Sequence, residues 1–255
     1  MVLVLGVAVY AGYRYTRPYL HGTGCRAGEE ALDPDQAGNA ATIAVVAAGE
    51  RLPERALVIA YATAMQESHI RNLEGGDRDS VGLFQQRPSQ GWGARERLMD
   101  PVYAAHRFFT ALAKVKGYRR LAVAEAAQRV QRSADGSAYA QHVTTAQTLA
   151  AAYTGRRPTA VICWFPPGHQ ATRRRAAALG ELRRAFGPDA PPMHDGTVAV
   201  AASREGWLVA SWAVSHARTY GLTDIRYAGR RWKSANGYAG WTKDRTAPND
   251  KVIVK

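Results

Sequence analysis

The hydrophobic pattern of residues 56–65 stands apart from the rest of the chain because it is apolar on every side. The stretch reads Ala-Leu-Val-Ile-Ala-Tyr-Ala-Thr-Ala-Met and is too short to cross a bilayer, so we expect the central buried helix of a soluble domain, over residues 53–68. Pro53 suits the first turn of this helix. The pattern predicts four further helices in this part of the chain, at residues 36–51, 101–115, 122–133 and 138–153.

The pattern changes at residues 155–158, where Gly-Arg-Arg-Pro interrupts the helices. Residues 159–165 then read as a strand, because β-branched and aromatic residues follow one another up to a Pro-Pro pair. Beyond them we expect a basic amphipathic helix at residues 171–186 and a Pro-rich link at residues 188–192. We also expect a second helix at residues 205–220 and three strands, at residues 197–201, 224–227 and 251–254. The predicted fold class is α+β, with a mainly helical domain, a connecting region and a small α+β domain at residues 37–155, 156–195 and 196–255.

Glu67 is the candidate catalytic residue because it falls in the last turn of the apolar helix. The negative end of the helix macrodipole and the apolar surroundings both disfavour a charged carboxylate there, so we expect its pKa to be raised. A carboxyl group with a raised pKa can act as a general acid near neutral pH. The alternative is a solvated acid at a helix end. The turn-rich segment up to residue 80 and the apolar and amide groups of residues 81–88 favour catalysis, because such a loop can fold back over the acid.

Two short motifs carry a resemblance to a known superfamily. Glu67-Ser68 and Gly82-Leu83-Phe84-Gln85 resemble, in order and spacing, the Glu-Ser and Gly-Leu-Met-Gln motifs of soluble lytic transglycosylases and goose-type lysozymes. Asp100-Pro101 is similar to the Asp-Pro that opens the next helix in that superfamily, although the pair also suits any helix start. The string at residues 77–93 more closely resembles a subgroup of exported actinobacterial proteins and reads Asp-Arg-Asp-Ser-Val-Gly-Leu-Phe-Gln-Gln-Arg-Pro-Ser-Gln-Gly-Trp-Gly.

The resemblance covers residues 37–155 and implies a lysozyme-like domain that cleaves the glycosidic bond between the alternating sugars of peptidoglycan, with one Glu as acid and then base. In lytic transglycosylases the sugar's own 6-hydroxyl attacks and leaves a 1,6-anhydro end, whereas hydrolases use water. The superfamily's third motif, Ala-Tyr-Asn-Ala-Gly, falls at residues 125–133 and is altered here. Substrate contacts are expected from hydroxyl, amide and aromatic groups of these motifs, at Ser68, Phe84, Gln85, Gln86, Gln128 and Gln131. One of three aromatic residues is expected to stack on a sugar in the cleft: Phe84, Trp92 or Tyr103.

An ordinary glycosidase needs a second carboxylate, and the separation of the two groups decides the stereochemistry. Asp77 and Asp79 lie in the loop after the acid and are auxiliary candidates that would orient a water. The same side chains can instead cap turns or pair with Arg78, which is the more common role. A single acid with an internal hydroxyl nucleophile therefore fits the chain better than hydrolysis by two carboxylates.

The last part of the chain, through residues 207–232, resembles the C-terminal module often joined to such exported proteins, itself similar to zinc D-Ala-D-Ala carboxypeptidases. A catalytic version would end in Asp-His-x-His, but residues 249–254 read Asn-Asp-Lys-Val-Ile-Val. His194 and His216 lie outside any ligand spacing, so we expect no metal, no other cofactor, and a wall-binding or spacing role. Two tryptophans of the module either line a remnant groove or belong to the core: Trp232 and Trp241.

Composition and charge narrow the expected partners. The chain has 255 residues, of which 46% are hydrophobic and 22% charged, so a mostly disordered protein is excluded and two domains fit. A net charge of +13 favours an anionic partner, either nucleic acid or the acidic polymers of a bacterial envelope. The sequence lacks zinc-finger spacing, an RNA-binding aromatic motif and a phosphate-cradling glycine loop. We therefore expect peptidoglycan glycan strands as the partner and no nucleic acid.

The first 20 residues are expected to carry the chain to the envelope, because they resemble the apolar part of a signal peptide or signal anchor. They lack a preceding basic region and are short for a full membrane span of about 20 apolar residues. Either translation begins upstream, or the anchor is unusually short, or the segment is a folded helix. We expect an exported protein, tethered to the membrane and facing the cell wall or secreted, with a linker at residues 21–36.

Cys25 and Cys163 are the only two cysteines and lie far apart in the sequence. Disulfides form and persist in oxidising compartments, so in an exported protein we expect these two to pair. Two free buried thiols are the alternative for a cytosolic chain.

Two other kinds of function remain beside a lytic transglycosylase or muramidase. A non-catalytic peptidoglycan-binding protein would keep the cleft without turnover, as the altered third motif suggests. A structural partner of an envelope assembly would keep only a vestigial cleft.

Overall fold

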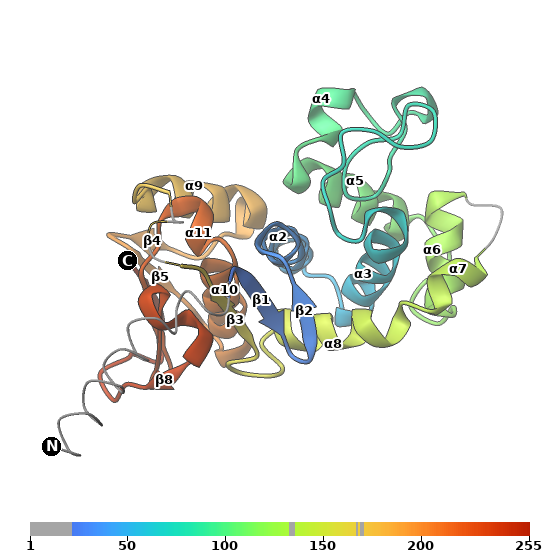
Figure 1. Ribbon diagram of the computed structural model, residues 1–255. Coiled ribbons are helices and arrows are strands. Elements are labelled where there is room, and N and C mark those ends of the chain that lie inside the picture. Colours follow the sequence, from blue (N-terminus) through green and yellow to red (C-terminus); the bar gives the residue numbers. More distant parts are fainter. Residues whose placement is uncertain (1–21, 133–135, 167, 169–170) are drawn as a thin grey trace, which may run out of the picture.

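The fold is described from a computed structural model of the chain, for residues 22–132, 136–166, 168 and 171–255 (Figure 1). Its first part comprises β1 (Gly24–Ala27), β2 (Glu30–Leu32), α2 (Pro34–Gly49), α3 (Glu54–Ser68), η1 (Pro88–Gln90), α4 (Arg95–Leu98), α5 (Pro101–Ala113), α6 (Val123–Gln131), α7 (Ser137–Ala140) and α8 (Val143–Tyr153). Its second part comprises β3 (Val161–Trp164), α9 (Arg175–Phe186), η2 (Gly187–Asp189), β4 (Met193–His194), β5 (Thr197–Ala199), α10 (Ser203–Ser215), α11 (Ala217–Tyr220), β6 (Asp224–Tyr227), β7 (Arg230–Lys233), η3 (Ser234–Ala239), β8 (Thr242–Lys243) and β9 (Lys251–Val254). Helices combine with two antiparallel sheets, so the predicted α+β class is confirmed.

The predicted signal anchor, residues 1–20, lies outside the described residues. Among the residues that the structure describes, no helix is both long enough and apolar enough to cross a membrane. The membrane tether therefore stays a prediction from the sequence.

Local sequence explains where the two central helices begin and end. The Asp33 side chain accepts a hydrogen bond from the Gln36 N–H at 2.8 Å, and the Gln36 side chain accepts one from the Asp33 N–H at 2.9 Å, so α2 starts with a reciprocal capping box. Pro53 precedes α3, and residues 56–64 of that helix are all buried, as the apolar pattern predicts. The helix ends at His69, whose φ of 53° is left-handed.

Element boundaries differ from the prediction in both parts. The helix predicted over residues 138–153 is two helices, α7 and α8. The helix predicted over residues 205–220 is two helices, α10 and α11, because the backbone at His216 leaves the helical region with φ −95° and ψ 3°. The basic helix predicted from residue 171 begins at Arg175. The short strands β4, β7 and β8 are not predicted by the sequence pattern.

Residues 22–36, predicted as part of a linker, instead form a β-hairpin and the start of α2. β1 pairs antiparallel with β2 on one side and with β3 on the other, giving the sheet order β2-β1-β3. In this register Cys25 lies directly opposite Cys163, and the two form the predicted disulfide across 138 residues of sequence. The N-terminal hairpin is thereby fixed to the second part of the chain.

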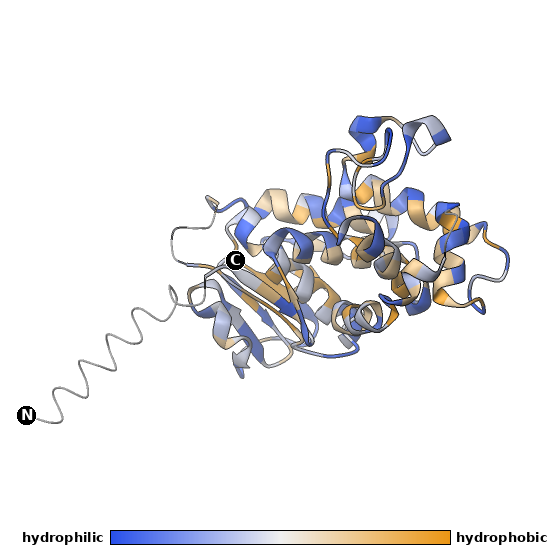
Figure 2. Cartoon of the chain, turned by 45° about the vertical axis from the view of Figure 1, so that its right-hand side comes forward, coloured by the Kyte–Doolittle hydropathy of each residue, from blue (hydrophilic) through white to orange (hydrophobic). Residues whose placement is uncertain are grey.

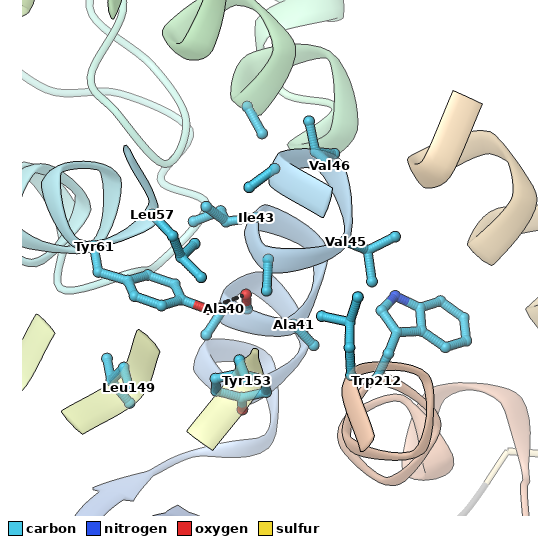
Figure 3. Packing of buried hydrophobic residues seen from close by; sticks show 14 of the residues in the cluster. Ala40, Ala41, Ile43, Val45, Val46, Leu57, Tyr61, Leu149, Tyr153 and Trp212 are labelled. Carbon is cyan, nitrogen blue, oxygen red and sulfur yellow. Dashed lines mark hydrogen bonds between the residues drawn. The ribbon is translucent and has the colours of Figure 1, made fainter. Parts of the chain in front are cut away.

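Helix α2 joins the two parts of the core, because its buried side chains face both (Figure 3). On one side Ala40 lies near Leu57 and Tyr61 of α3, and the Tyr61 hydroxyl donates to the Ala40 carbonyl at 2.8 Å. On the other side Val45 lies near Trp212 of α10. One hydrophobic cluster includes buried residues of both parts. The two predicted domains therefore share a core.

The second part is built on a six-stranded antiparallel sheet of order β4-β5-β9-β6-β7-β8, which packs against α10. Figure 2 shows hydrophobic residues along the strands of this sheet. Trp232 of β7 is fully buried and donates from Nε1 to the Cys163 carbonyl at 3.2 Å. Trp241 donates in the same way to the Val161 carbonyl at 2.9 Å. Both tryptophans hold β3 against the sheet, which is a core role.

His216 makes the stability of this core depend on pH. Its ring stacks on Trp212 with centroids 4.1 Å apart and lies 3.4 Å from the Thr42 hydroxyl of α2. Burial lowers the pKa of His216 to about 4, below the value of about 6.5 expected in the unfolded chain. Between these values the unfolded state binds the proton and the folded state does not, so the unfolding free energy falls as the pH drops.

We expect wild type to lose up to about 3 kcal/mol of unfolding free energy through this group as the pH falls from about 6.5 to about 4. Denaturant unfolding of wild type and His216→Gln at pH 7.5 and pH 4.5 measures the effect. The variant should lose less stability on acidification. Equal losses in both proteins would contradict the assignment.

Candidate active site

Glu67 lies in the last turn of α3, where the long loop between α3 and α4 folds back over the helix end (Figure 1). Its side chain is half-buried, and Oε1 accepts a hydrogen bond from the Tyr139 hydroxyl at 2.7 Å. For the other carboxylate oxygen, the described residues supply no hydrogen-bond partner. Tyr139 is itself buried in α7. A core side chain thus fixes one oxygen and leaves the other for a ligand.

Ser68 anchors this loop to α3. Its buried hydroxyl donates to the Leu83 carbonyl at 2.7 Å. Gly82 lets the loop turn back, because its φ is 77° and a Cβ there would lie 2.6 Å from the Leu98 carbonyl oxygen. Ser68 was expected to contact substrate, but its hydroxyl holds the loop that covers the acid.

Asp79 braces the same loop. It accepts hydrogen bonds from the Ser89 N–H at 2.7 Å, the Ser89 hydroxyl at 2.9 Å and Arg87 Nε at 2.9 Å. The Ser89 N–H, and then Arg87, hold the pKa of this carboxyl well below its usual range. A carboxylate kept ionised in this way is a weak base for activating water. The auxiliary catalytic role expected of Asp79 is therefore replaced by a structural one.

A polar cavity of about 400 Å³ lies beside the acid. Its described lining is formed by Glu67, Asp77, Ser80, Gln85, Arg87, Gln90, Trp92, Gln131 and Arg132. Gln85 has φ 46° at the turn of the loop, and its Oε1 accepts a hydrogen bond from the Ser80 hydroxyl at 3.0 Å. Gln131 donates from Nε2 to the Phe84 carbonyl at 2.7 Å, while its Oε1 is buried and has no partner within the described chain. Two carboxylates, several amides, two arginines and an indole ring therefore meet in one hollow.

Two residues expected to contact substrate belong to the core instead. Phe84 is fully buried and stacks on Phe108 with ring centroids 4.4 Å apart. Gln86 is buried and donates from Nε2 to a backbone carbonyl of α5 at 3.2 Å.

Gln128 lies on α6 and is not among the described residues that line the cavity. Of the three aromatic candidates, Trp92 is the one found in the described lining.

Asp77 lines the cavity and its side chain is 89% exposed, so it stays the one auxiliary carboxylate in the described lining besides Glu67. Its nearest cation is Arg78, with 3.9 Å between Arg78 Nε and Asp77 Oδ2. An exposed pair at this distance is weak and leaves the carboxylate accessible.

Sequence reasoning missed Tyr139 and the two arginines of the cavity. Tyr139 lies 72 residues after Glu67, on a short helix that reaches α3 only through tertiary packing. Arg132 directly follows Gln131. The amides retained in the altered third motif were therefore the sequence feature nearest to this arginine. Arg87 lies inside the motif loop and takes part in bracing it.

In the second part of the chain, the two histidines considered as zinc ligands lie in separate environments. His194 is exposed and lies 3.2 Å from Asp195, whereas His216 is half-buried and stacks on Trp212 beside α2. No group of three His, Cys, Asp or Glu residues is arranged for metal binding in the described ranges. Asp224 instead forms ion pairs with two arginines of the sheet, Arg226 and Arg231.

No protein-family model matches this chain, and no curated protein matches it either. Its function is therefore inferred from the geometry around Glu67 and from the motifs that build this geometry.

Proposed function

We propose that the protein cleaves the glycosidic bond of peptidoglycan glycan strands, with Glu67 as general acid and then base. The observation that carries the proposal is the environment of this one carboxyl group. The Glu67 side chain is half-buried and lines the cavity. One carboxylate oxygen is held by Tyr139 at 2.7 Å, and the other has no hydrogen-bond partner among the described residues. A positioned carboxyl group with a free oxygen can transfer a proton to a bound substrate.

The proposed reaction uses that free oxygen twice. Protonated Glu67 gives its hydrogen to the bridging oxygen as the C1–O bond breaks. The ionised carboxylate then accepts the proton of the 6-hydroxyl of the same sugar, whose oxygen forms the new bond to C1. This restores the acid and leaves a 1,6-anhydro end. Asp79 is braced by Ser89 and Arg87, which removes one of the two auxiliary carboxylates, and attack by the internal hydroxyl needs neither of them.

The rest of the lining supports a sugar as the ligand. Trp92 offers an aromatic face for a pyranose ring, and Gln85 and Gln90 offer amide donors and acceptors. A polar cavity of about 400 Å³ suits one or two sugar units.

The disulfide supports a location where peptidoglycan is found. Cys25 and Cys163 are bonded to each other, and such bonds persist in oxidising compartments outside the cytoplasm. We therefore place the protein at the cell wall, exported and either anchored by residues 1–20 or released.

Incubation of purified protein with peptidoglycan glycan strands, followed by mass analysis of the products, tests the proposal. New anhydro ends, one water lighter than reducing ends, support the proposed reaction. New reducing ends would assign the attack to water. Binding without new ends would instead support the non-catalytic peptidoglycan-binding protein, which the altered segment at residues 125–133 favours.

Tyr139→Phe should reduce the cleavage rate about tenfold while leaving the fold intact. The variant loses one hydrogen bond to Glu67 Oε1, and a hydrogen bond to a charged group is worth about 1.5–3 kcal/mol. The carboxylate would then rotate more freely in the cavity. Rates of strand cleavage in wild type and variant, with thermal melts as a check on folding, measure the effect. An unchanged rate would show that Tyr139 does not position the acid.

A further inference from the structure

A second cavity of about 380 Å³ adjoins the one beside Glu67. The two share part of their lining, namely Gln90, Trp92 and Arg132. The second cavity extends away from the acid along α5 and α6, whose residues form most of its remaining described wall. A strand bound beside the acid would therefore reach the second cavity past Trp92.

Its described lining is cationic, with Arg107, Lys114, Arg129 and Arg132 and no acidic residue. Arg129 pairs with Glu125 at 2.7 Å, and Arg107 donates to the backbone carbonyls of Gly91 and Trp92 at 2.9 and 2.7 Å. These two arginines therefore already make hydrogen bonds or an ion pair within the protein.

Lys114 and Arg132 differ from the other two cations. Both are exposed, and neither forms an ion pair with any residue that the structure describes. Lys114 is the C-cap residue of α5, so its charge also lies at the negative end of the helix dipole. Two accessible positive charges at one cavity favour an anionic group of the ligand.

We propose that this second cavity binds carboxylates of the peptides that hang from the glycan strand, one or more sugars away from the cleaved bond. The inference rests on the proposed function. The acetylated amino sugars of the strand are uncharged once the peptide is attached, so the anionic groups of the polymer are on its peptides. The cavity beside Glu67 would bind sugar, and the neighbouring one would select strands that still carry peptides.

The test uses the Glu67→Gln protein, so that strands are bound and not consumed. Labelled strands with their peptides are titrated and followed by fluorescence anisotropy, beside the same strands stripped by an amidase. The lactyl carboxyl groups that the amidase exposes are converted to amides, so that the stripped strands are uncharged. We expect peptide-bearing strands to bind about tenfold tighter at low salt, as one charge-assisted contact allows. This preference should weaken as ionic strength rises.

Lys114→Glu should remove most of that preference and leave binding of stripped strands nearly unchanged. Lys116→Glu is the matched control, because Lys116 is also an exposed lysine, two residues away, and is not among the described residues lining the cavity. Thermal melts confirm that both variants are folded.

Equal affinity for the two kinds of strand, or equal effects of the two lysine variants, would overturn the inference and leave the proposed function standing. Failure of the Glu67→Gln protein to bind any strand would overturn both. A third arm uses stripped strands that carry a phosphodiester polymer. If these are preferred over peptide-bearing strands, and Lys114→Glu abolishes that preference, the cavity binds phosphate and the peptide assignment is wrong.

Discussion

Glu67→Gln should lower the rate of glycan strand cleavage by about a thousandfold, within the range that general acid–base groups contribute. The amide has nearly the same shape as the carboxyl group, and its oxygen can still accept the hydrogen bond that Tyr139 donates at 2.7 Å in wild type. It cannot give a proton to the bridging oxygen or take one from the attacking hydroxyl. Both halves of the reaction therefore fail, while strands still bind. Product formation by mass, together with binding of intact strands, measures the two effects separately.

Asp77→Asn is the matched control, because Asp77 is the other carboxylate in the described lining of the cavity. Its side chain is largely exposed, and in a single-acid mechanism it has no proton to move, so its amide variant should cleave within a few fold of wild type. A loss as large as that of Glu67→Gln would reveal a second essential carboxylate and a hydrolytic mechanism. Full turnover by Glu67→Gln would remove Glu67 from catalysis altogether.

The position of the acid could be predicted from the sequence because it depends on local order. The apolar run that begins at Ala56 has one way to be buried, and the first polar side chains after it mark the helix end. Tyr139 could not be found in this way, since its contact with Glu67 depends on how α7 packs on α3. Nothing in the residues around Tyr139 distinguishes a tyrosine that holds a catalytic carboxyl from one in any other helix.

The side chains of the motif loop show a second limit. Phe84, Gln85 and Gln86 are consecutive, and the sequence gives no reason to separate them. In the structure the backbone turns at Gln85 with φ 46°, so that Gln85 lines the cavity while its two neighbours are buried in the core. The motif resemblance thus predicted a substrate loop, but the backbone turn that separates its side chains depends on the contacts beneath it.

The linker prediction was wrong for a related physical reason. Residues 24–27 are too short and irregular in pattern to be recognised as a strand, and they pair both with β2 nearby and with β3 from far along the chain. The expected export and the presence of only two cysteines suggested that Cys25 and Cys163 pair, whereas their position opposite each other follows from the register of β1 and β3. Non-local strand pairing, rather than propensity, sets this part of the fold.

Replacing both Cys25 and Cys163 by Ala should lower the free energy of unfolding by about 3–5 kcal/mol. The bond closes a loop with a sequence separation of 138, for which the chain-entropy model gives about 5 kcal/mol, and measured gains are often smaller. Both cysteines are almost fully buried, so Ala avoids placing a new polar group in the core. At roughly 2–4 °C per kcal/mol for a chain of this size, the melting temperature should fall by about 10 °C.

Thermal melts with and without a thiol reductant separate the bond from the packing of its side chains. Reductant should lower the melting temperature of wild type towards that of the double variant and should leave the variant unchanged. A wild type indifferent to a reductant that is shown to break the bond would contradict the expected stabilisation. None of the residues described as lining the cavity beside Glu67 belongs to β1 or β3, so below its melting temperature the variant should cleave strands at the wild-type rate. A variant that stays folded but loses turnover would instead show that the hairpin helps to set the geometry of the acid through α2.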